Sequence, residues 1–256
     1  MNEDLAYWGI GDVDELSLPA SFQLADGTLP FSFGDVCMSD SYLFSPNVSK
    51  YINSIVDKYC AEELELAIES CIEVTESSFP YFYKLFDFCK RKICVNEDVT
   101  LVLSPLIKDL NGLCFEFNER LFIMVSMNSL MDLDEGETKF LLGHELGHIV
   151  IGHLNYHIVR GLLKSRNILS FPFGTLIEDK FDELYFGWCK DSEFTADRAG
   201  LICCGKIEYV ESLFHYVNNN TNHKKSPVDD YSSHPSLNNR IGQLKSFQTV
   251  IKNNNL

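Results

Sequence analysis

The sequence predicts an α+β fold that is mainly α-helical and contains a small antiparallel sheet. Two observations support this prediction. Most of the 256-residue chain consists of segments whose apolar residues recur at helical spacing. Between residues 99 and 126, by contrast, short β-branched and aromatic runs alternate with turn residues. Hydrophobic residues make up 45% of the chain, which is enough for a substantial core, so we expect an ordered domain.

The N-terminal part of the chain falls into three segments. The first 45 residues are rich in Gly, Pro, Ser and Asp and predict irregular structure. Residues 45–74 have apolar positions near helical spacing and predict one helix or two consecutive ones. Residues 81–93 predict a further helix, with Tyr81, Leu85 and Phe88 on one side.

Strands and further helices follow. Residues 99–103 form a β-branched run, and residues 113–117 and 121–126, separated by "NER", predict a hairpin. Asp134 and Glu137 have the spacing of a capping box and predict the start of a helix. Further helices are expected at 156–166, 177–204, 206–217 and 236–250, with a polar loop at 218–233.

The composition excludes several classes of partner. The net charge is −16 and no cluster of Lys and Arg occurs, so we expect neither nucleic acid nor an anionic membrane surface as a partner. No apolar run is long enough to span a membrane, so no membrane insertion is expected. The nine cysteines form no CxxC pair and favour free thiols in a cytoplasmic protein. The oligomeric state is not indicated.

One stretch, "GHELGHIVIGHL" at residues 143–154, carries metal chemistry. His144 and His148 are four residues apart, so both imidazoles can point at one metal ion from the same face of a helix. Glu145 is displaced by about 100° around the axis, so its carboxylate can reach a metal-activated water instead of the metal. A catalytic zinc normally has three protein ligands, so one more is required.

Two glycines and a third histidine in this stretch need separate explanations. Gly143 and Gly147 each cost a helix about 1 kcal/mol relative to alanine, so we expect a neighbouring backbone or a bound chain close to them. His153 lies about 140° around the helix from His148 and so faces elsewhere. We interpret His153, and likewise His157, as a structural or surface histidine.

A carboxylate further along the chain offers the third ligand. Glu193 lies in "WCKDSEFTADRAGLICC", and Asp197 follows it by one helical turn. Such an aspartate can hydrogen-bond a ligating histidine and fix its tautomer. Taken alone, the two acidic residues could equally be a solvated helix face, because the chain contains 37 Asp and Glu residues.

Three motifs in order, "LLGHELGHIVIGH", "SEFTADRAGL" and "SSHPSLNNRI", resemble the zinc metallopeptidase family of HtpX, the CAAX prenyl proteases and Oma-type proteases. The resemblance is closest to the soluble bacterial members and spans roughly residues 78–247. It implies a zincin-type metallopeptidase domain at 78–256, of the gluzincin class, that uses one zinc ion to cleave a peptide or protein substrate. Residues 1–77 would be an N-terminal extension that acts as a prosegment, an inhibitory cover or a part of the core.

The resemblance also assigns roles by position. It implies that His144, His148 and Glu193 are the zinc ligands and that Glu145 is the general base. Asp197 matches the family's aspartate behind the ligands. His234 matches a histidine that steadies the transition-state oxyanion. Arg240 matches the arginine that follows it, and either contacts the site or forms a structural ion pair.

The predicted strand 121–126 also fits the family. It would be the edge along which an extended substrate adds, with Ile123 and Val125 as supporting residues. Two alternatives stay open. The chain could be a catalytically silent or latent zinc-binding regulatory protein of the same fold. It could also be a regulatory protease of the ImmA/IrrE kind, which shares "HELGHIVIGH" but usually carries its glutamate closer to that helix.

Overall fold

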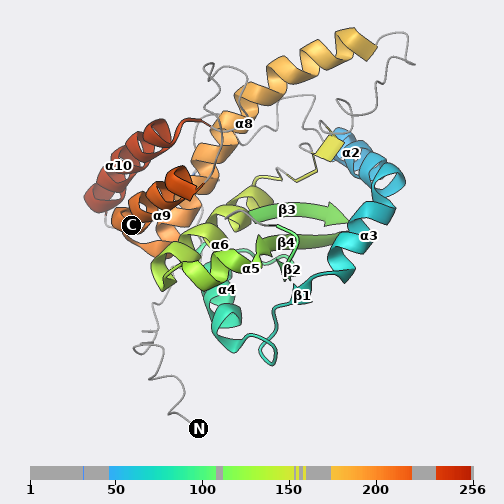
Figure 1. Cartoon of the computed structure of the whole chain (residues 1–256). Coiled ribbons are helices and arrows are strands. Elements are labelled where there is room, and N and C mark those ends of the chain that lie inside the picture. The colour runs from blue at the N-terminus through green and yellow to red at the C-terminus, as the bar shows by residue number, and fades with distance from the viewer. Residues whose placement is uncertain are drawn as a thin grey trace.

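The computed structural model describes residues 31, 46–107, 112–152, 154–155, 158–159, 174–220 and 235–254, which form helices around a four-stranded sheet (Figure 1). The helices are α2 (Pro46–Tyr59), α3 (Ala61–Glu69), α4 (Pro80–Lys92), α5 (Met127–Asp132), α6 (Glu135–Val150), α8 (Gly174–Cys204), α9 (Ile207–Asn220) and α10 (Leu237–Asn254). The strands are β1 (Ile72–Glu73), β2 (Val99–Ser104), β3 (Gly112–Phe117) and β4 (Arg120–Ser126). The mainly helical α+β class is confirmed.

The sheet is mixed: the predicted antiparallel pairing holds for β1–β2 and β3–β4, but not for β2–β4. The strand order is β1-β2-β4-β3, and β2 runs parallel to β4. The chain leaves β2, returns along β3 and turns back into β4, so β4 points the same way as β2. The turn between β3 and β4 has positive φ at Asn118 (49°) and Glu119 (60°), as a tight hairpin turn requires.

The edge strand is β3, and the expectation that residues 121–126 form the edge was wrong. β4 pairs with β2 on one side and with β3 on the other. Ile123 and Val125 are 0% exposed and belong to the hydrophobic core, so their side chains do not form an open edge. Within the part of the chain that the structure describes, no strand pairs with the outer side of β3.

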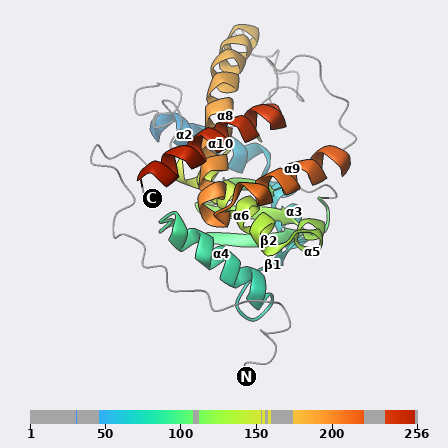
Figure 2. The ribbon, with the colours of Figure 1, turned by 90° about the vertical axis from the view of Figure 1, so that its left-hand side faces the viewer.

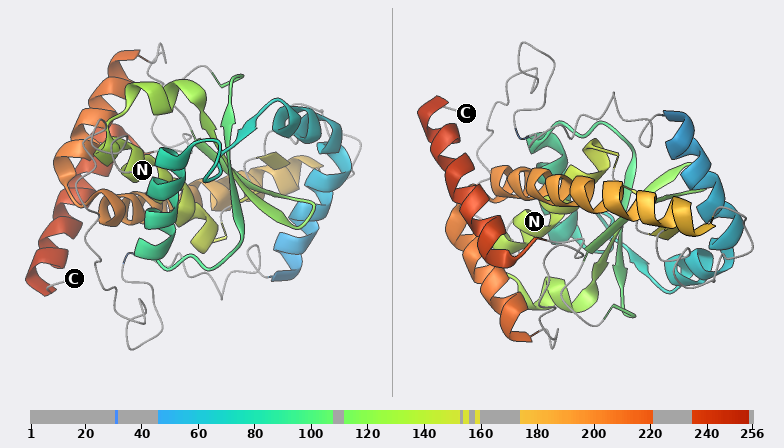
Figure 3. Two further views of the ribbon diagram at one scale, coloured as in Figure 1. Left: turned by 90° about the horizontal axis from the view of Figure 1, so that it is seen from below. Right: turned by 90° about the horizontal axis from the view of Figure 1, so that it is seen from above.

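The two faces of the sheet are covered by different helices. α3 packs on one face and α6 on the other, while α9 and α10 lie at the end of the molecule opposite α2 and α3 (Figure 1). Phe115 and Phe117 of β3 pack towards α3, whereas Cys114 packs with the core around α6. The long α8 runs across the molecule (Figure 3), and α10 crosses it (Figure 2). No helix among the described residues has the length and apolar character needed to cross a lipid bilayer.

Part of the expected N-terminal extension contributes to the same core. β1 pairs with β2, with Ile72 opposite Leu103. Val56 of α2 and the isolated described residue Phe31 are both 0% exposed, and Phe31 belongs to the main core cluster. The sheet therefore contains strands from both sides of the boundary predicted after residue 77.

The helix that carries His144 and His148 begins where the sequence predicts. Asp134 accepts a hydrogen bond from the Glu137 backbone N–H (2.8 Å), and the Glu137 carboxylate accepts one from the Asp134 N–H (3.0 Å). This capping box fixes the first turn of α6. His144, Glu145 and His148 follow in the third and fourth turns.

The glycines of α6 allow α8 to approach closely. A Cβ added at Gly147 would lie 2.8 Å from the Ala196 Cα. One added at Gly143 would lie 2.7 Å from the Cys203 Sγ and 3.0 Å from the Gly200 Cα. The expectation of a neighbouring backbone at both glycines is confirmed, and this contact brings the two helices of the site together.

Replacing Gly147 with alanine is therefore expected to destabilise the protein by about 1–3 kcal/mol, because the methyl group overlaps the α8 backbone. Affinity for the zinc ion that the resemblance implies should fall as well, since α8 carries Glu193, the implied third ligand. Urea unfolding and zinc titration measure both effects. Gly242→Ala on α10 is the matched control, because no atom lies within 4 Å of its added Cβ. A Gly147→Ala variant as stable as the control would contradict the close-contact explanation.

Candidate metal centre

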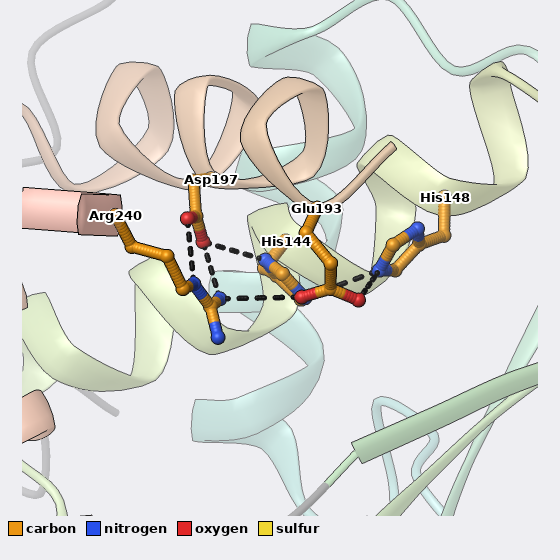
Figure 4. A network of polar contacts seen from close by, with 5 residues as sticks. All are labelled: His144, His148, Glu193, Asp197 and Arg240. Atoms are coloured by element: carbon orange, nitrogen blue, oxygen red, sulfur yellow. Dashed lines mark hydrogen bonds and ion pairs between the residues drawn. The ribbon is translucent and has the colours of Figure 1, made fainter. Parts of the chain in front are cut away.

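Three side chains from two helices converge on one point (Figure 4). His144 and His148 come from α6 and Glu193 from α8. The two Nε2 atoms lie 3.1 Å apart. The Glu193 Oε1 is 3.4 Å from the His148 Nε2, and Oε2 is 3.7 Å from the His144 Nε2. All three residues are buried, and one potential ligand atom from each lies within 4.8 Å of the others.

The donor set fits a divalent metal ion. The Nδ1 of His144 lies 3.1 Å from the Asp197 carboxylate and donates a hydrogen bond to it. That bond places the ring proton on Nδ1 and leaves the Nε2 lone pair facing His148 and Glu193. Two neutral imidazoles and one carboxylate form a common ligand set of catalytic zinc, which leaves a coordination position open.

Asp197 is held by Arg240 from α10. The Arg240 Nε donates to the Asp197 Oδ2 (2.7 Å) and Nη2 to Oδ1 (2.5 Å), and Nη2 also lies 3.5 Å from the Glu193 Oε2. Burial alone would raise the pKa of Asp197, but the charge and hydrogen bonds of Arg240, together with His144, hold this pKa below its ordinary value. Asp197 is therefore ionised at neutral pH and can accept the bond from His144.

The sequence left two possibilities for Arg240, and the structure combines them. Arg240 forms a buried ion pair with Asp197 and also approaches Glu193. Burial by itself lowers the pKa of its guanidinium, but Asp197 and Glu193 raise that pKa above the ordinary value, so Arg240 carries a positive charge. This arginine therefore balances the negative charge behind the three converging side chains.

Glu145 lies beside the edge strand and outside the converging group. It is 5% exposed, and a Cβ added at Gly112 would lie 2.5 Å from its Oε1. Burial raises the pKa of the Cys114 thiol well above its ordinary value, and the nearby Glu145 and Glu193 add to this effect. A hydrogen bond between the Cys114 thiol and Glu145 acts in the same direction. Cys114 carries no sequence signal, because an isolated cysteine in a strand matches no motif.

Several residues from the sequence analysis lie outside the described part of the chain. These are His153, His157, His234 and most of the loop at 218–233. The role that the resemblance implies for His234 stays a prediction. Pro235, directly after it, is described and is buried.

Comparison with known families supports the same interpretation. The model of peptidase family M48 matches residues 96–248, which run from just before β2 into α10 and include every residue of the site described above. A comparison with curated proteins gave no significant match. Because the family match covers more than half of the chain, the chain belongs to peptidase family M48, a family of zinc metallopeptidases.

Proposed function

We propose that this protein is a zinc-dependent endopeptidase that hydrolyses peptide bonds in protein or peptide substrates. The observation that carries the proposal is the buried convergence of His144, His148 and Glu193, with Glu145 also buried and next to His144 on α6. Family membership supports a metalloprotease, and the geometry supports specific residues for its steps.

In this proposal His144, His148 and Glu193 hold the zinc ion. A bound zinc ion would polarise the substrate carbonyl and lower the pKa of a water molecule. Glu145 would take the proton from that water and deliver it to the nitrogen of the departing amine. Glu145 lies against Gly112 of the edge strand and directly follows His144 on α6, which suits both transfers.

Charge balance supports a divalent ion. Glu145, Glu193 and Asp197 are three carboxylates, and Arg240 is one guanidinium close to two of them. With the imidazoles neutral, these four groups carry a formal charge of −2. A divalent cation would neutralise that charge, which is costly to leave uncompensated in a buried site.

The edge strand β3 supports an extended substrate. No strand in the described part of the chain pairs with its outer side, and Glu145 lies against its first residue, Gly112. A peptide that adds to this edge as a further strand would bring a backbone carbonyl close to Glu145 and to the zinc ligands. In this proposal the substrate adds to the outer edge of β3, and not to the strand that contains Ile123 and Val125.

Removing the metal is expected to abolish activity. Purified full-length protein should contain one zinc ion per chain, lose peptide cleavage after treatment with a chelator and regain it when zinc is added back. Zinc should also raise the unfolding temperature in a concentration-dependent way, because only the folded chain brings the three ligands together. Metal analysis, a fluorogenic peptide assay and thermal unfolding measure the three effects.

Two outcomes would point elsewhere. Cleavage that persists unchanged without metal would contradict the proposal. One bound zinc ion without any cleavage would favour the latent or silent regulatory protein. In that case a chain lacking residues 1–30, which keeps the buried core residue Phe31, would show whether the N-terminal segment suppresses activity.

The proposed role of His234 is tested separately. His234→Ala is expected to lower kcat by about 10²-fold, the usual effect of removing an oxyanion donor, with zinc content unchanged. His215→Ala is the matched control, since His215 is exposed on α9 and bonds Asn219. Equal kcat values for the His234→Ala and His215→Ala variants would exclude His234 as a residue that stabilises the oxyanion.

A further inference from the structure

Asn155, shortly after the end of α6, binds the backbone of the edge strand. It is 1% exposed. Its Oδ1 accepts a hydrogen bond from the Glu116 N–H (3.1 Å), and its Nδ2 donates to the Glu116 carbonyl (2.7 Å). Nδ2 also donates to the Oδ1 of Asn53 on α2 (2.9 Å). The side-chain amide of Asn155 thus makes the two hydrogen bonds that a neighbouring strand would make at Glu116.

The hairpin register shows which backbone groups of β3 face outwards. Phe117 pairs with Arg120 across the two-residue turn. In such a hairpin the pair next to the turn exchanges hydrogen bonds, and bonded and non-bonded pairs then alternate. Glu116 is therefore in a non-bonded pair and points its N–H and C=O away from β4, which agrees with its bonds to Asn155. By the same alternation, Cys114 and Gly112 also point outwards.

These outward groups differ in what they contact. Those of Glu116 are occupied by Asn155. Gly112 and Cys114 both lie next to Glu145. The part of the β3 edge that they form is therefore beside the proposed general base. From Gly112 to Glu116 the strand rises about 13 Å, which provides room for about four substrate residues.

We infer that Asn155 ends the substrate-binding edge of β3 and so determines how far a peptide can pair on one side of the scissile bond. The inference rests on the proposed endopeptidase function. The substrate would pair with the outward groups of Gly112 and Cys114, and would meet Asn155 where the next pair, at Glu116, would form. Asn155 is therefore a specificity-determining residue that does not take part in the chemistry.

A purely structural role for Asn155 can be separated by experiment. Asn155 also bonds Asn53, so it could serve only to attach α2 to the sheet. The Asn53→Ala variant removes that attachment and leaves both bonds to Glu116. Asn155→Ala removes the attachment and also opens the edge at Glu116. A difference between the two variants therefore reports on the edge itself.

The experiment uses zinc-loaded full-length protein and one peptide that it cleaves, selected from a random synthetic decapeptide library. This peptide is shortened and lengthened residue by residue on both sides of the scissile bond, and kcat/KM is measured for each length. Single N-methylation of each backbone nitrogen except the scissile one then shows which substrate N–H groups form bonds. Loss of one such bond is expected to lower kcat/KM about fivefold.

For the wild type and for Asn53→Ala, kcat/KM on one side should stop rising after about four residues, with no more than two sensitive N–H groups spaced two residues apart. For Asn155→Ala, kcat/KM of the shortest good substrate should stay within about twofold of wild type. A third sensitive N–H should appear two residues further along, with a gain of about fivefold from the added length.

Two results would overturn the inference. In the first, the wild type shows three or more alternating sensitive positions on both sides of the scissile bond. In the second, Asn155→Ala gives the same length profile as Asn53→Ala. If Asn155→Ala does not fold, the wild-type scan still decides. Failure of the wild type to cleave any library peptide with zinc bound would instead count against the proposed function.

Discussion

Replacing Glu145 with glutamine is expected to lower kcat/KM by about 10²–10⁴-fold while zinc content stays at one ion per chain. Glutamine keeps the size of the side chain, which lies against Gly112, but cannot accept the proton of a water molecule. The three converging ligand atoms belong to other residues, so metal binding should persist. Peptide cleavage, metal analysis and thermal unfolding of the same preparation measure these effects together.

Glu135→Gln is the matched control for this variant. It makes the same change of charge in the first turn of the same helix, where Glu135 is partly exposed and pairs with Lys139. We expect this control to cleave peptides at close to the wild-type rate. A Glu145→Gln variant that cleaves as fast as the control would exclude Glu145 as the general base. If the Glu145→Gln variant loses its zinc, Glu145 is needed for metal binding, and its effect on cleavage cannot be assigned to proton transfer.

The parts of the site that lie within one helix could be predicted from the sequence. The spacing of His144, Glu145 and His148 fixes their relative directions once the segment is helical, and the Asp134 capping box marks where that helix begins. Gly143 and Gly147 also indicated a close neighbour. Glycine destabilises a helix relative to alanine, so its presence there suggests that another segment occupies the place of a side chain. Local geometry was sufficient for these conclusions.

The order of the strands could not be predicted in this way. Alternation and turn residues identify the β3–β4 hairpin, but they do not show which of its two strands receives a third one. β2 pairs with β4, which buries Ile123 and Val125 and leaves β3 at the edge. The two-residue β1 and the six-residue α5 are too short to give a periodic signal.

Contacts between distant segments required either a resemblance or the structure. The resemblance identified Glu193 and Asp197, whose side chains would otherwise be typical of a solvated helix face. The bonds of Arg240 to Asp197 join α10 to α8 and follow from the packing of those helices. The pairing of Asn155 with Glu116 had no sequence signal at all, because an asparagine that binds a backbone has no motif.

The second large effect is expected at Asp197, which is 0% exposed. Asp197→Ala should lower the free energy of unfolding by about 3–5 kcal/mol, because it leaves Arg240, whose side chain is only 11% exposed, without its main partner. Zinc affinity should fall about 10–100-fold, since His144 loses its acceptor. Arg240 would then pair with Glu193, already 3.5 Å away, and compete with the metal for that carboxylate. Urea unfolding and competitive zinc titration measure the two quantities.

Two further variants show whether the unpaired charge is the cause. Adding Arg240→Met to Asp197→Ala removes the buried cation and should recover part of the lost stability, but not the zinc affinity that depends on His144. Glu211→Gln disrupts an exposed ion pair with Lys245 on the same helix as Arg240, and should change stability by no more than about 1 kcal/mol. If the double variant were less stable than Asp197→Ala, packing by the Arg240 side chain would outweigh its charge, and the ion pair would not be what fixes α10 against the site.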